Sequence, residues 1–184
     1  MQERVQAQRI LFGYTTYVAP ANVTFPEGLT AYIVDDVTET SMNLREIDAV
    51  EEGTPIILKA EEAGDYTLSI ADKTDDASDN WLQASDGNVS GGETIYALAK
   101  KDGVVAFYQV NSNVTIPAGK AYLDLGHAPG AKALTFTFTD ADGIKTIETV
   151  SAEAAAEIFN LAGQRMSRPV KGVNIINGKK VLIK

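Results

Sequence analysis

The sequence has no cysteine and a single histidine among its 184 residues. The absence of cysteine excludes a disulfide framework and a cysteine-ligated metal site. The histidine, His127, lies between Gly126 and Pro129 in a predicted loop, with no nucleophile placed beside it. A hydrolase triad needs a base that an orienting group holds in place. We therefore predict that His127 is an ordinary loop residue and that the chain is not an enzyme.

Basic residues are also scarce. The chain has 16 Lys and Arg against 25 Asp and Glu, a net charge of −9 and a pI of about 4.6. This balance argues against a nucleic-acid partner, because binding to phosphates requires clustered Lys and Arg. No stretch approaches the ~20 apolar residues of a membrane-spanning helix, so we predict no transmembrane segment.

Most of the chain consists of short runs of β-branched and aromatic residues between Gly, Pro, Asn and Asp, which is typical of strands and turns. In Leu134 to Thr139, apolar residues alternate with threonines, as in a strand with one buried face. A chain of this length can bury a substantial core. The predicted strands of the body are 11–19, 29–34, 42–49, 56–58, 66–70, 94–98, 104–110, 120–125, 134–139 and 144–150.

An internal repeat organises these strands. The segment 30–34 (TAYIV) resembles 94–98 (TIYAL), and about 20 residues later in each case 53–57 (GTPII) resembles 119–123 (GKAYL). Similarity at an offset of about 65 residues indicates a repeated supersecondary unit. We predict an all-β fold, a sandwich or partly closed barrel built from two similar β units.

The predicted organisation places this β module at residues 10–140, after a disordered N-terminal segment at 1–9. A linker at 141–156 follows, in which Ser151 to Ala156 forms either one helical turn or plain linker. A β tail at 157–184 ends the sequence. In the tail, Asn177-Gly178 separates two apolar runs and suits a type I′ hairpin turn. We expect three short strands here, which need a surface to pack on.

The tail differs from the body in charge, because its last 20 residues contain Lys and Arg but no Asp or Glu. An acidic body with a basic tail indicates either a separate role for the tail or its electrostatic docking onto the body. The tail contains NLAGQR at 160–165, a basic Pro-containing loop, and KGVNIINGKKVLIK at 171–184. This order resembles the C-terminal sorting domain of Bacteroidetes secreted proteins. The residues that carry the resemblance are Gly163, Arg165, Lys171, Gly172, Asn177, Gly178, Lys179 and Lys180.

The resemblance implies that the type IX secretion machinery recognises the tail and that the protein is extracellular or on the outer cell surface. One departure is Asn174, where that family more often has an aromatic residue. The alternative is an ordinary edge hairpin at the end of a β domain. Because Met1 to Arg9 lacks the apolar region of a signal peptide, we expect the chain to be the C-terminal part of a longer precursor.

The body resembles a β module common near the C-termini of Bacteroidetes surface proteins, among them adhesin-like leucine-rich-repeat proteins and secreted hydrolases. The matching segments include GYTTY at 13–17, PEGLTAY at 26–32, EGTPIILK at 52–59 and IPAGKAYL at 116–123. That module has no assigned chemistry. The resemblance therefore implies only a surface location and an accessory role, and we expect no cofactor.

Two groups of side chains are candidates for ligand binding. Asp72, Asp75, Asp76 and Asp79 form the densest carboxylate cluster, but their spacing matches no EF-hand, which favours solvated turn residues over a calcium site. Aromatic residues form either core or a sugar-stacking platform; core is favoured, with Trp81 the exception because it lies in a loop-rich region. The aromatic residues considered are Tyr14, Tyr17, Trp81, Tyr96, Tyr108 and Tyr122.

The sequence thus predicts a non-catalytic, secreted or cell-surface accessory module with a sorting tail, whose partner is the secretion machinery. The alternative is a carbohydrate-binding module attached to a secreted hydrolase or adhesin, with a glycan or host surface as partner.

Overall fold

The computed structural model describes residues 13–128 and 130–139 in full. It also gives the secondary structure of 4–10, 145–147, 158–159, 165–166, 172–176 and 179–183. The chain divides into two compact units, Met1–Val150 and Ser151–Lys184. All regular secondary structure in the described residues is β, which confirms the predicted fold class. No helix in the described part of the chain has the length and apolar character to cross a membrane.

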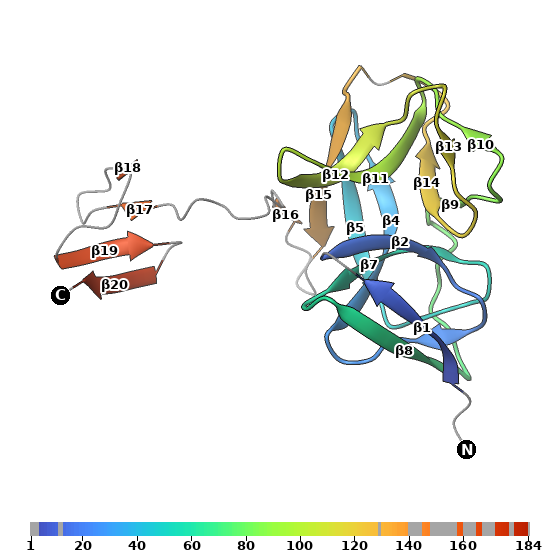
Figure 1. Cartoon of the computed structure of the whole chain (residues 1–184), viewed down its shortest axis with the longest axis horizontal. Coiled ribbons are helices and arrows are strands. Elements are labelled where there is room, and N and C mark those ends of the chain that lie inside the picture. Colours follow the sequence, from blue (N-terminus) through green and yellow to red (C-terminus); the bar gives the residue numbers. More distant parts are fainter. Residues whose placement is uncertain are drawn as a thin grey trace. The chain divides into compact units, whose positions relative to one another are not determined.

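The first unit contains sixteen strands (Figure 1). They are β1 (Arg4–Ile10), β2 (Tyr14–Val18), β3 (Val23–Thr24), β4 (Leu29–Val37), β5 (Ser41–Ile47), β6 (Ala49–Val50), β7 (Pro55–Ala60), β8 (Gly64–Ile70), β9 (Gln83–Ala84), β10 (Val89–Ser90), β11 (Ile95–Lys101), β12 (Val104–Gln109), β13 (Thr115–Ile116), β14 (Ala121–Asp124), β15 (Ala133–Thr139) and β16 (Lys145–Ile147).

Each strand predicted for the body has a counterpart among these sixteen. Two further strands lie where the sequence predicts none. β10 falls in the loop predicted at 85–92, because a two-residue strand is too short to show a period. β1 falls in the segment 1–9, predicted to be disordered; the structure instead pairs it antiparallel with β8.

The internal repeat is a structural repeat. In the first repeat (β2 to β7), the hairpin β4–β5 extends through β4 to β7 and then β2. In the second (β9 to β14), the hairpin β11–β12 extends through β11 to β14 and then β9. Equivalent pairs lie 66 residues apart, and they are Tyr17–Ile56 with Gln83–Tyr122, and Val23–Val50 with Val89–Ile116. The structure therefore confirms two similar β units.

Strand β15 joins the two repeats into one sheet. It pairs in parallel with β5, where Phe136 lies opposite Met42, and antiparallel with β12, where Leu134 lies opposite Phe107. The resulting order is β2-β7-β4-β5-β15-β12-β11-β14-β9, and β16 pairs with β15. This ten-stranded sheet curls into a nearly closed barrel (Figure 1). Two smaller sheets, β1-β8-β3-β6 and β10-β13, complete the unit.

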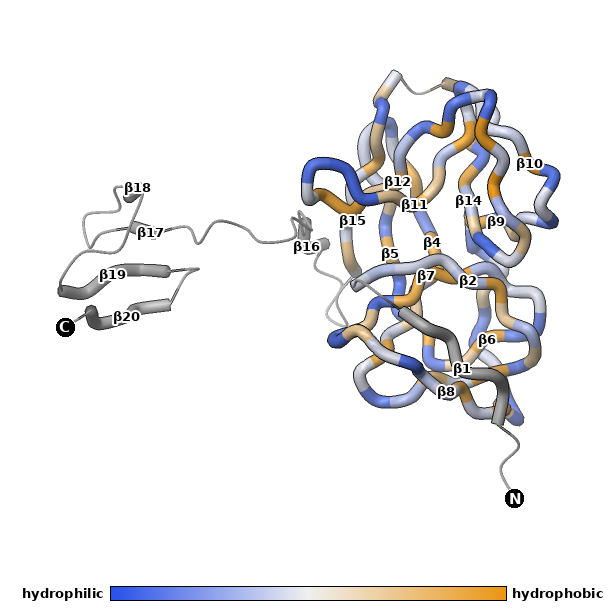
Figure 2. The backbone as a smooth tube through the Cα atoms, viewed as in Figure 1, coloured by the Kyte–Doolittle hydropathy of each residue, from blue (hydrophilic) through white to orange (hydrophobic). Residues whose placement is uncertain are grey.

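The core has residues from both repeats. Hydrophobic stretches run along the barrel strands, while many connecting turns are hydrophilic (Figure 2). The main cluster combines Leu44 of the first repeat, Tyr96 and Phe107 of the second, and Phe136 of β15, each at most 1% exposed. Burying each such side chain stabilises the fold by about 1.5–3 kcal/mol. Because one cluster includes both repeats, neither repeat has a complete core of its own.

The second unit contains β17 (Ile158–Phe159), β18 (Arg165–Met166), β19 (Gly172–Ile176) and β20 (Lys179–Ile183). They form a four-stranded sheet in the order β18-β17-β19-β20. The sequence predicts three strands, and the fourth, β18, falls in the predicted basic loop. The Asn177-Gly178 turn and the segment Ser151 to Ala156 lie outside the described residues.

Candidate functional site

Trp81 lies on a firmly bonded segment between β8 and β9. Its backbone N–H donates to the carbonyl of Val34 at 2.8 Å. The adjacent Asn80 accepts through Oδ1 from the N–H groups of Val34 and Leu82, both at 3.1 Å, and donates through Nδ2 to the carbonyl of Pro55 at 2.8 Å. These bonds form where the β4–β5 register shifts, between Val34 and Asp36. They hold the backbone of Trp81 in place while its side chain remains 47% exposed.

The other aromatic candidates do not gather around Trp81. Tyr96 and Tyr122 are buried, and Tyr14 packs against Phe136 with ring centroids 5.5 Å apart. Within residues 13–128 and 130–139, Trp81 makes no contact with another aromatic ring. A single exposed indole offers one stacking surface rather than a platform.

Burial affects the buried tyrosines in a common way. It raises the pKa of the Tyr96 and Tyr122 hydroxyls above the usual value of 10.0, and nearby carboxylates raise each further. Each hydroxyl donates a hydrogen bond: Tyr96 to the carbonyl of Ala131 at 2.6 Å, and Tyr122 to Oε1 of Gln83 at 3.0 Å. These groups therefore belong to the packed interior rather than to a reactive site.

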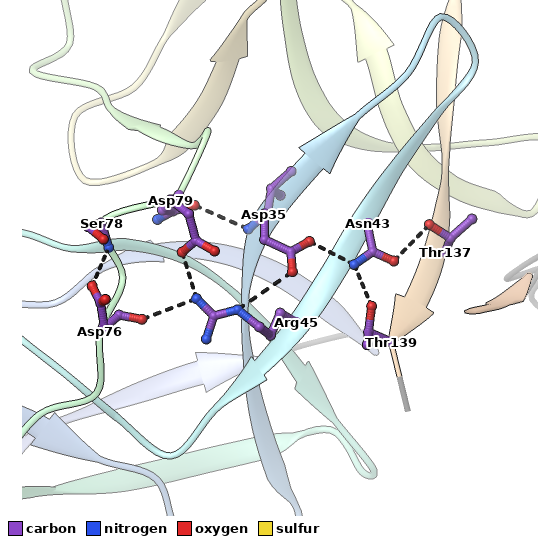
Figure 3. A network of polar contacts seen from close by, with 10 residues as sticks. Asp35, Asn43, Arg45, Asp76, Ser78, Asp79, Thr137 and Thr139 are labelled. Carbon is purple, nitrogen blue, oxygen red and sulfur yellow. Dashed lines mark hydrogen bonds and ion pairs between the residues drawn. The ribbon is translucent and has the colours of Figure 1, made fainter. Parts of the chain in front are cut away.

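The acidic cluster is part of a structural network (Figure 3). Asp79 receives a 2.6 Å hydrogen bond from Nη2 of Arg45, which also donates to the carbonyl of Asp76 at 3.1 Å. On its other side Nε of Arg45 lies 3.6 Å from Oδ2 of Asp35. Oδ2 of Asp75 accepts from the backbone N–H groups of Asp48 and Ala49. The carboxylates thus fix the 75–79 loop against β5.

No group of three or more His, Asp or Glu in the described residues has the geometry to hold a metal ion. Hydrogen bonds from the backbone and side chain of Ser78 lower the pKa of Asp76, and the charge of Arg45 lowers it further. His127 is exposed, and its Nδ1 lies 2.9 Å from the carbonyl of Leu125, an arrangement in which Nδ1 donates.

The predicted tail residues fall in the second unit. Arg165 begins β18, Gly172 begins β19, and Lys179 and Lys180 begin β20. Four others lie outside the described residues: Gly163, Lys171, Asn177 and Gly178.

Sequence reasoning missed a cleft of about 740 Å³, which we call the lysine groove. It is lined by β2, by the strands β11 to β13 and by the start of β14. Its lining includes Lys100, Lys101 and Lys120 and no Asp or Glu, although the chain is strongly acidic. The ammonium of Lys101 lies 4.5 Å from the centroid of the Tyr108 ring. One signal was available, because Lys100-Lys101 is the sole pair of adjacent basic residues before the tail.

A second cleft, of about 670 Å³, has the opposite charge. Its lining includes Glu51, Glu52, Asp75 and Asp76 and no Lys or Arg. The body therefore segregates its charges between two hollows. Comparison with protein-family models, curated proteins and solved structures found no match to this chain.

Proposed function

We propose that this chain is a non-catalytic accessory module of a secreted or cell-surface protein, and that its C-terminal tail is the sorting element. One observation carries the proposal: the tail has NLAGQR, a basic Pro-containing loop and KGVNIINGKK in the order found in sorting domains. The separation of Ser151–Lys184 as a compact unit with its own sheet supports it, since a recognition element benefits from folding apart from its cargo.

The accessory role is supported by how the body uses its polar groups. A general base works best when its pKa lies near the working pH. The pKa of Asp76 is instead lowered by Ser78, and that of Asp86 by Asn88, so both carboxylates are weak bases. Asn43 and Ser85, which are buried, form hydrogen bonds that join strands and turns. These groups stabilise the fold.

The sorting role is tested by deleting residues 172–184 in the native host. We expect the truncated protein to be made but not attached to the cell surface, as judged by surface proteolysis and by blotting of the medium and cell fractions. The matched control replaces Lys73 by Ala, an exposed lysine of the body, and keeps surface attachment. Surface display of the truncated protein would contradict the proposal.

A carbohydrate-binding module is the second candidate function, and the exposure of Trp81 on a hydrogen-bonded backbone favours it. Indole faces stack on sugar rings and keep one polar edge in water. The test is a glycan array probed with the wild-type protein, with Trp81→Ala and with Ile70→Ala, the last removing another exposed apolar side chain. Binding lost only in Trp81→Ala supports this function. Absence of binding by the wild type excludes it.

A further inference from the structure

The lysine groove adjoins an open sheet edge. Strand β2 is the first in the order of the ten-stranded sheet, and β7 is its sole strand partner among the described residues. The carbonyl of Gly13 accepts from Ala60, and the N–H of Ala19 donates to Thr54, so odd-numbered residues bond toward β7. Even-numbered residues such as Thr16 and Val18 therefore direct their backbone groups to the other side. An open edge of this kind accepts an added strand.

The groove also has an apolar lining. Ala97 and Ala99 of β11 line it together with Val110, Val114 and Ile116. The side chain of Val114 is 46% exposed, which is unusual for valine next to a well-packed barrel. An extended peptide places alternate side chains on opposite faces. A strand added along β2 would thus direct one set of side chains toward this apolar surface.

The charge of the groove selects the partner. Lys120 donates through Nζ to the Thr15 hydroxyl and the Thr16 carbonyl, both at 3.3 Å, so its recorded acceptors are neutral oxygens. Lys100 and Lys101 are exposed at the hairpin between β11 and β12. A hollow with one sign of charge and low-dielectric walls concentrates ligands of the opposite sign. The basic segment 165–184 of this chain has the wrong charge to occupy it.

We propose that the lysine groove binds an acidic, extended peptide segment of a partner protein. The peptide adds a strand to the open edge of β2, its apolar side chains contact the groove, and its carboxylates lie beside Lys100, Lys101 and Lys120. This is the β-augmentation mode of recognition, in which main-chain hydrogen bonds provide affinity and pockets provide specificity. A peptide is favoured over an acidic polysaccharide because only a peptide uses the backbone edge. The inference concerns the body and does not depend on the sorting role of the tail.

The test measures fluorescence anisotropy of a labelled decapeptide in which glutamate and valine alternate, titrated with the full chain. We expect saturable binding that weakens at high salt, because screening acts on exposed charges. The double variant Lys100→Glu/Lys101→Glu should bind at least about tenfold more weakly, which corresponds to 1.4 kcal/mol. Both lysines are exposed, so the variant retains the fold. The matched control Lys73→Glu, a charge reversal outside the groove, should bind as the wild type does.

Two further ligands separate strand addition from simple charge attraction. A decapeptide with N-methyl groups on alternate residues keeps its carboxylates but loses donors of the ladder, so its binding should fall to that of the charge-reversed protein variant. Polygalacturonate tests an acidic polysaccharide. The proposal is overturned if the Glu-Val peptide does not bind, if N-methylation has no effect, if Lys73→Glu weakens binding equally, or if polygalacturonate binds more tightly than the peptide.

Discussion

The side-chain amide of Asn43 on β5 donates to the hydroxyl of Thr139 on β15 at 2.6 Å, across 96 residues of sequence. The same Nδ2 donates to Oδ1 of Asp35 at 2.7 Å, and Oδ1 of Asn43 accepts from the hydroxyl of Thr137 at 3.1 Å (Figure 3). Because β15 also pairs with β12 of the second repeat, this network stabilises the strand that joins the two repeats.

Asn43→Ala should therefore destabilise the whole first unit. The side chain is buried, at 4% exposed, and its removal leaves Asp35 and the two threonines without their amide partner. We expect a loss of about 1–3 kcal/mol in the free energy of unfolding, since unpaired buried polar groups cost this much. Urea denaturation followed by circular dichroism measures it. Asn113→Ala, at an exposed turn position, should stay within about 0.5 kcal/mol of the wild type. Equal midpoints for the two variants would refute the role of Asn43.

The two repeats predict equal responses at equivalent glycines. The N–H of Gly53 donates to Ala19 at 2.7 Å, and that of Gly119 donates to Ser85 at 3.0 Å. Their φ angles are +82° and +75°, and a Cβ added at either would meet nothing within 4 Å. Alanine at each position should cost backbone strain alone, about 1–2 kcal/mol.

Gly91 provides the contrast to this pair. A Cβ there would lie 2.3 Å from the carbonyl oxygen of Asn111 and 2.6 Å from that of Val110. Gly91→Ala must therefore move backbone, and it should destabilise the protein more than Gly53→Ala or Gly119→Ala. Thermal unfolding of the three variants tests the order, with Gly64→Ala, whose Cβ meets only ordinary contacts, as the control. A much larger loss for Gly119→Ala than for Gly53→Ala would contradict the equivalence of the repeats.

The fold class was predictable because local pattern determines it. Leu134, Phe136 and Phe138 alternate with threonines in the sequence, and in β15 these three residues are the buried ones. The repeat was readable from TAYIV and TIYAL because both segments form the central strand of a three-stranded unit. The parallel pairing of β15 with β5 was not predictable, because strand partners far apart in sequence leave no mark on either strand alone.

The lysine groove shows the same limit. Lys120 lies 19 residues after Lys101, and only the pairing of β11 with β14 brings their strands side by side. The aromatic residues illustrate a related difficulty, since Tyr96 and Trp81 are equally good candidates by residue type. Tyr96 is fully buried and Trp81 is 47% exposed. Exposure depends on which face of which layer a residue occupies, and this is a property of the assembled barrel.

At high pH the buried tyrosines should limit stability. Burial raises the pKa of Tyr17, Tyr96 and Tyr122 above 10.0 in the folded protein, and Glu39 adds to the effect at Tyr96. Below pH 10 both folded and unfolded states hold these protons. Above it the unfolded chain ionises first, so stability declines as pH rises through the raised folded pKa. Spectrophotometric titration should show a late group of tyrosines whose ionisation coincides with loss of the circular dichroism signal. A single transition of all seven tyrosines near pH 10, with the fold intact, would contradict this.

Asn80 should matter more to stability than its neighbour Trp81, although tryptophan is the larger residue. The three hydrogen bonds of the Asn80 side chain join β4, β7 and the segment before β9. Asn80→Ala leaves the N–H groups of Val34 and Leu82 and the carbonyl of Pro55 without that partner, and we expect a loss of about 1–3 kcal/mol in the free energy of unfolding.

Trp81→Ala removes a side chain that is 47% exposed, so we expect a loss of less than about 1 kcal/mol, because only part of its apolar area returns to water. Urea denaturation of both variants and of the double variant gives the order and the coupling between the two side chains. If Trp81→Ala is the more destabilising, the indole is a packing residue, and its exposure no longer favours a role in ligand binding. If Asn80→Ala is, then the fold stabilises the backbone of Trp81 without requiring the indole, as expected for a side chain retained for contact with a ligand.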